Sequence, residues 1–83
     1  MTVVARRKVR EVIGEVPSGP VDGVNASFTT AQGFVSGSTR LYLNGVRLLR
    51  GPGDDYVESG SSGVQFNFVP RSGDQVVIDY YRS

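Results

Sequence analysis

Residues 41–48 read LYLNGVRL, and this stretch gives the clearest local structural signal in the chain. Asn44 and Gly45 both tolerate positive φ, which the type I′ turn of a two-residue β-hairpin requires. The alternating runs on either side predict a hairpin in which Leu43 lies opposite Val46 and Tyr42 opposite Arg47. Because side chains alternate across a strand, four apolar side chains are expected to share the core face: Leu41, Leu43, Val46 and Leu48. The opposite face is expected to carry Arg40, Tyr42 and Arg47.

The rest of the chain continues in short runs rich in Val, Phe, Tyr, Ile and Thr, separated by Gly, Ser, Pro and Asp. This spacing is typical of an all-β protein. The predicted strands are 26–30, 39–43, 46–49, 55–58, 64–69 and 75–81. The turn residues at 70–74 predict that the last two of these strands pair antiparallel. The expected fold is therefore a small antiparallel β-sandwich or barrel with an N-terminal extended arm.

The first residues differ from the rest and divide the chain into an arm (1–18) and a β-sandwich domain (19–83). Residues 17–23, PSGPVDG, separate the two. The apolar positions of the arm fit a strand (Val3, Ala5, Val9, Ile13) or a helical stripe (Ala5, Val9, Val12, Val16). The many β-branched residues favour an extended arm or an edge strand.

Length and composition limit what the chain can be. Its 83 residues make at most one domain, which buries only about 60–65% of its unfolded surface. The sequence has no Cys and no His, which excludes disulfides and a conventional structural zinc site. The net charge of +1 argues against binding of nucleic acid by bulk electrostatics, and no apolar run is long enough to span a membrane. Oligomerisation or docking on a larger assembly remains as a source of extra stability.

No constellation for catalysis, a metal or a cofactor is recognisable. Asp54-Asp55 follows a Gly-Pro-Gly run, and Asp22-Gly23 stands near Asn25, as expected of turns and not of a calcium loop. Without His there is no base to activate a Ser or Thr nucleophile, and no glycine motif for phosphate binding occurs. We therefore expect a protein that is not an enzyme and that needs no metal or cofactor.

Two surfaces are predicted to bind partners. The arm combines apolar residues with a basic run that could contact an acidic protein surface or nucleic acid. The outer face of the hairpin pairs Tyr with Arg, residues that are enriched at protein interfaces, although an ordinary sheet surface or a platform for sugars or bases has the same composition. The candidate partner-binding residues are Val3, Val4, Arg6, Arg7, Lys8, Arg10, Tyr42 and Arg47.

Three segments together resemble a small β module of tailed-bacteriophage structural proteins: GPVDGVNASFTT (19–30), LYLNGVRLLRGPGDDYV (41–57) and FNFVPRSGDQVVIDYY (66–81). The matching positions are Asp22, Gly23, Asn25 and Phe28, then Asn44, Gly45, Asp55 and Tyr56, then Pro70, Gly73, Asp74 and Tyr80. The chain departs from the family pattern at GPGDDYV, where that pattern has a shorter turn. The family module is also often one domain of a longer fibre or tail protein.

The resemblance implies a structural component of a phage virion, such as a capsid decoration protein or a head–tail or tail-surface protein. The expected partners are other virion proteins, namely major capsid or tail proteins, and further copies of the chain, with a trimer as the first expectation. No membrane and no specific nucleic acid are expected. A carbohydrate-binding β-sandwich that uses Tyr42 and its neighbours is the alternative from another class.

Overall fold

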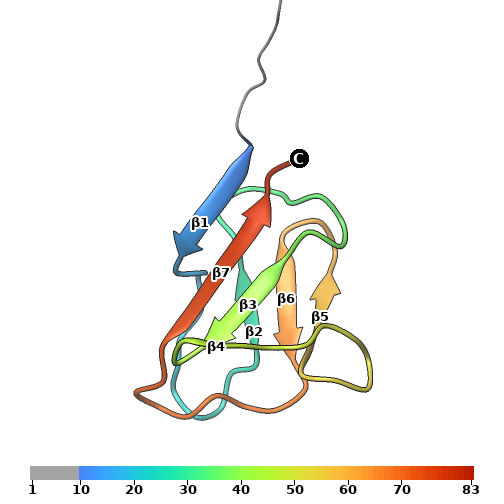
Figure 1. Cartoon of the computed structure of the whole chain (residues 1–83). Helices are drawn as coiled ribbons and strands as arrows, with labels where there is room; N and C mark the ends of the chain where they lie inside the picture. The colour runs from blue at the N-terminus through green and yellow to red at the C-terminus, as the bar shows by residue number, and fades with distance from the viewer. Residues whose placement is uncertain (1–9) are drawn as a thin grey trace, which may run out of the picture.

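The computed structural model describes residues 10–83, which form two antiparallel sheets packed face to face (Figure 1). One sheet has four strands in the order β1-β7-β3-β4, and the other has three in the order β2-β6-β5. The described residues contain no helix, so the prediction of an all-β sandwich is confirmed. The strands are β1 (Glu11–Glu15), β2 (Ser27–Thr29), β3 (Arg40–Leu43), β4 (Val46–Arg47), β5 (Tyr56–Ser59), β6 (Gly63–Phe66) and β7 (Val76–Tyr81).

The Asn-Gly hairpin joins β3 to β4 as predicted. Asn44 and Gly45 have φ of 52° and 83°, and Tyr42 pairs with Arg47. The Asn44 side chain also ties the turn to the start of β7: its amide donates to the Asp74 carboxylate at 3.0 Å, and its oxygen accepts from the Gln75 N–H at 2.8 Å. The turn therefore fixes the relative position of two strands that are far apart in sequence.

The core lies between the two sheets and is filled by alternate residues of their strands. On β7 the predicted stripe of Val76, Ile78 and Tyr80 is fully buried. Phe28 and Phe66 meet edge to face across the second sheet, with ring centroids 5.5 Å apart. The buried hydrophobic residues are Phe28, Phe34, Leu41, Tyr56, Val64, Phe66, Val76, Ile78 and Tyr80.

The prediction that Val46 faces the core is wrong. Its side chain is 64% exposed, whereas Leu41 is completely buried and Leu43 and Leu48 are partly buried against the core. Val46 lies beside the turn on a two-residue strand at the edge of its sheet. The alternation of side chains places Val46 on the same side of the sheet as Leu43, but its position at the sheet edge leaves the side chain in solvent.

The prediction that segments 64–69 and 75–81 pair as a hairpin is also wrong. β6 pairs with β2 and β5, whereas β7 pairs with β1 and β3 in the other sheet. The strand stops at Phe66, and Phe68 and Val69 are 40% and 44% exposed. The Asn67 side chain bonds to carbonyl oxygens of the 51–54 loop, which draws the chain away from the sheet. Residues 67–75 then cross between the two layers (Figure 1).

Residues 11–15 of the predicted arm form the edge strand β1, which pairs antiparallel with β7. The strand reading is therefore confirmed for this part, and the helical alternative is not. The pairing is interrupted between Val12 and Glu15, where Gly14 has φ of 74° and its N–H donates to the Asp79 carboxylate. β1 thus belongs to the four-stranded sheet and extends its outer face.

Candidate protein interface

The outer face of the four-stranded sheet is formed by the residues that alternate with the core positions. The strand register places Tyr42 of β3 beside Val77 of β7, Arg40 beside Asp79, and Glu11 of β1 beside Tyr81. Ile13 of β1 is 70% exposed and Tyr81 47% exposed. Within residues 10–83 no further layer covers this face (Figure 1), so it is available as a mixed apolar and polar surface.

Opposite charges meet at the centre of this face, where one arginine lies between two carboxylates. Arg40 contacts Glu11 at 2.7 Å and Asp79 at 3.9 Å. The hydrogen bond from Arg40 to Glu11 and the two nearby carboxylates raise the pKa of Arg40 above its ordinary value. Since Asp79 also accepts the Gly14 N–H at 2.8 Å, this network joins three strands. Arg40 is thus engaged within the sheet, and sequence reasoning did not identify its two acidic partners.

Tyr42 and Arg47 are the two predicted partner-binding residues that the structure brings together. They are directly opposite each other on β3 and β4, with Tyr42 half-buried and Arg47 exposed. Tyr81 lies on the same face but four positions beyond Val77, about 13 Å along β7. The two Tyr rings therefore do not form one continuous platform.

The remaining predicted partner-binding residues belong to the N-terminal segment. Arg10 is exposed, and its carbonyl accepts the Arg82 N–H at 2.9 Å, so Arg10 is held against the fold at the start of β1. Val3, Val4, Arg6, Arg7 and Lys8 lie outside the described residues. The start of β1 lies next to the chain's C-terminus (Figure 1).

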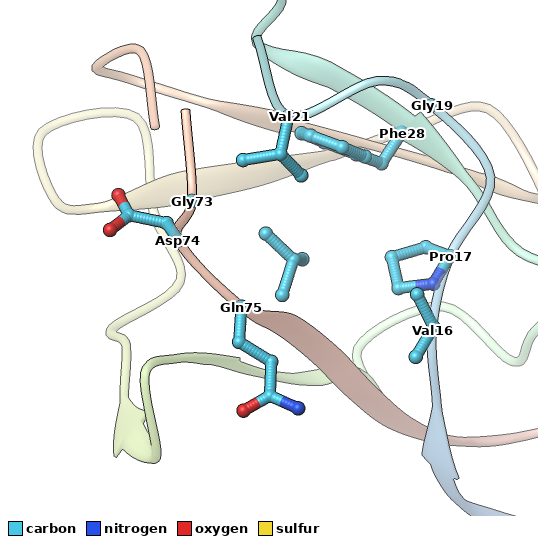
Figure 2. A pocket seen from close by; sticks show the side chains of 9 residues that line it. Val16, Pro17, Gly19, Val21, Phe28, Gly73, Asp74 and Gln75 are labelled. Carbon is cyan, nitrogen blue, oxygen red and sulfur yellow. The ribbon is translucent and has the colours of Figure 1, made fainter. Parts of the chain in front are cut away.

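A cavity of about 490 Å³ opens at the opposite end of the four-stranded sheet. Buried Phe28 lies against one side of it, and Val16 and Val21 line it from the segment after β1 (Figure 2). The third side is the start of β7, where residues 73–76 contribute Asp74 and Val76. Sequence reasoning missed this cavity because its lining comes from three separate segments, none of which carries a motif of its own.

Two carboxylates stand in the turns next to the cavity. Asp22 accepts the N–H groups of Asn25 and Val24, both at 2.9 Å, and these bonds lower the pKa of Asp22. The amide of Asn44 and the Arg71 N–H do the same for Asp74 and lower its pKa. Both side chains are therefore ionised at neutral pH.

The other acidic turn has a structural use as well. Asp55 accepts the Leu49 N–H at 2.9 Å. No cluster of three or more His, Cys, Asp or Glu side chains suited to a metal ion occurs in the described residues. In the same part of the chain, no helix of the length and hydrophobicity that a bilayer span requires is present.

Glu58 on β5 is an anchor that the sequence did not indicate. Its carboxylate accepts the Thr39 hydroxyl at 2.6 Å and the Gly37 N–H at 2.9 Å, while the buried Tyr56 hydroxyl bonds to the Thr39 carbonyl at 3.0 Å. Partial burial of Glu58 opposes ionisation, but these hydrogen bonds outweigh that effect, and the pKa of Glu58 lies below its ordinary value. The cluster ties the start of β3 to the second sheet.

This pKa shift gives a pH-dependent prediction. Because the pKa of Glu58 is lower in the folded than in the unfolded chain, its contribution to stability is complete above the unfolded-state pKa of about 4.3 and disappears as pH falls through the folded-state value. A Glu58→Gln variant should be less stable than the wild type at neutral pH, and the difference should shrink in acid. Urea unfolding between pH 7 and pH 3 measures this. A difference that stays constant with pH would contradict the role of the Glu58 charge.

Comparison of the chain with protein-family models, with curated proteins and with solved structures gives no match.

Proposed function

We propose that this chain is a non-enzymatic structural component of a tailed-phage virion, which attaches to the capsid or tail through its arm and its outer sheet face. The observation that carries the proposal is that face itself, an uncovered sheet surface with Ile13, Tyr42 and Tyr81 among the described residues. Tyr and Arg side chains are enriched at protein interfaces. The partners would be major capsid or tail proteins.

The resemblance to the phage module supports the proposal through residues that build the fold. Asn44 and Gly45 form the hairpin turn, Tyr56 and Tyr80 are buried in the core, and Asp74 anchors the turn before β7. These positions account for the sandwich and carry no chemistry of their own. The resemblance therefore supports the proposed type of module, and the outer sheet face supports the proposed mode of attachment.

The direct test is the composition of phage particles produced from the genome that encodes this chain. We expect mass spectrometry of purified particles to find the chain in many copies, and a Tyr42→Ala/Arg47→Ala variant to be incorporated less. Leu49→Ala, which changes another exposed side chain outside this face, should be incorporated normally. Particles that lack the wild-type chain would overturn the proposal.

The alternative of a carbohydrate-binding module has less support, since sugar stacking works best on adjoining aromatic rings and Tyr42 and Tyr81 lie about 13 Å apart along the strand. Retention of the isolated chain on a glycan array, lost on Tyr42→Ala, would favour this alternative over attachment to a particle.

A further inference from the structure

The cavity at the end of β7 combines an apolar lining with negative charge. Its side walls are Val16, Val21 and Phe28, and Asp74 is at its rim (Figure 2). Asp22 follows Val21 directly in the same turn and is exposed. The positive charge of Arg71 also acts on Asp74. A matching occupant would place apolar side chains in the cavity and more than one cation beside it.

The chain itself contains one segment with this composition. Residues 2–9 read TVVARRKV, in which Val3 and Val4 are separated by one alanine from the three basic residues at 6–8. An extended peptide of this kind spans about 3.3 Å per residue, so its valines and its cations can reach neighbouring parts of one site. The segment is thus chemically complementary to the cavity and its two carboxylates.

The position of Arg10 favours docking of residues 2–9 in the cavity of another copy over docking in the cavity of the same chain. Arg10 is at the end of β1 that pairs with the end of β7, and the cavity is at the start of β7, about 17 Å away along the strand. To reach its own cavity the segment must reverse direction next to β1. Residues 2–10 contain no Gly, Pro, Asn or Asp, the residues that favour such a turn.

We propose that residues 2–9 of one copy dock in this cavity of a second copy, with Val3 and Val4 against Val16, Val21 and Phe28, and with Arg6 and Arg7 facing Asp22 and Asp74. Because Arg10 and the cavity lie at opposite ends of the sheet, such a contact would be head-to-tail, and its repetition would close a ring or continue as a filament. The proposal concerns contacts between copies and holds whether or not the assembly is part of a virion.

The test uses full-length variants at the two sides of the contact. Val16→Lys places a cation in the cavity at a side chain that is 70% exposed. Leu49→Lys is the matched control at a side chain that is 64% exposed and is not part of the cavity lining. Val3→Asp/Val4→Asp alters the arm. Analytical ultracentrifugation should show self-association of the wild type and of Leu49→Lys, with a dissociation constant raised about tenfold or more in the other two variants. Raising the salt from about 0.05 M to 0.5 M should weaken association, because exposed charges are screened.

Mixing the two defective variants identifies the occupant. The Val3→Asp/Val4→Asp chain keeps an intact cavity and the Val16→Lys chain keeps an intact arm, so together they should form a one-to-one complex that neither forms alone. Absence of that complex, or a wild type that stays monomeric at all accessible concentrations, would overturn the proposal. So would self-association that Val16→Lys leaves unchanged while circular dichroism shows the variant folded. Presence of the chain in particles would be unaffected by any of these results, so failure here is distinct from failure of the virion role.

Discussion

Replacing Ile78 with alanine is expected to lower the free energy of unfolding by about 2–5 kcal/mol. Ile78 is completely buried in the middle of β7, where it pairs with Leu41 of β3 and Glu15 of β1. Loss of its side chain removes apolar contacts and leaves a cavity that the two rigid sheets cannot close. Small domains have only about 5–15 kcal/mol of stability in total, so the variant should be close to unfolding. Urea denaturation monitored by Tyr fluorescence measures the change.

Ile13→Ala is the matched control for this experiment. It makes the same chemical change in the same sheet, but at a side chain that is 70% exposed on β1. Such surface substitutions usually change stability by less than about 0.5 kcal/mol. Equal destabilisation by the two substitutions would contradict the arrangement of the two layers. If Ile13→Ala reduces incorporation into particles without lowering stability, this would add support to the outer face as the attachment surface.

The sequence was sufficient to predict features that depend on neighbouring residues. The turn at Asn44-Gly45 follows from the φ preferences of two residues, and the buried stripe of β7 follows from alternation. Both are local rules, and both are confirmed by the positive φ values and by the burial of Ile78 and Tyr80.

Features that depend on distant segments were not predictable in the same way. A loop with hairpin composition connects β6 to β7, yet the two strands lie in different sheets. The Asn67 side chain bonds to the 51–54 loop, and β7 is paired on both sides by β1 and β3. Val46 is likewise exposed because β4 is a two-residue strand at the edge of its sheet, and the sequence does not show where a sheet ends. The cavity beside Phe28 is formed by three segments and has no counterpart in any single one.

The boundary between arm and domain leads to the second large expected effect. Deleting residues 2–16 removes β1, whereas deleting residues 2–9 leaves every described strand in place. With β1 the fold loses Val12, which packs against the core, and Glu15, whose carboxylate accepts the Tyr80 hydroxyl at 2.5 Å and the Ala31 N–H at 2.8 Å. The edge of β7 also becomes exposed.

The two deletions are therefore expected to differ in their effect on stability: one destabilises the fold, and the other leaves its stability unchanged. Val12 is only partly buried, so its loss costs less than the about 1.5–3 kcal/mol of a fully buried Val side chain. Each lost hydrogen bond of β1 and Glu15 adds about 1 kcal/mol. The 2–16 deletion should therefore cost at least about 3 kcal/mol and lower Tm by about 10 °C or more, at roughly 4–8 °C per kcal/mol. The 2–9 deletion should keep a Tm close to that of the full chain. Thermal unfolding by circular dichroism distinguishes them. A shorter deletion that also unfolds the domain would place residues 2–9 in the fold of their own chain. This would contradict their role as a segment that binds other molecules.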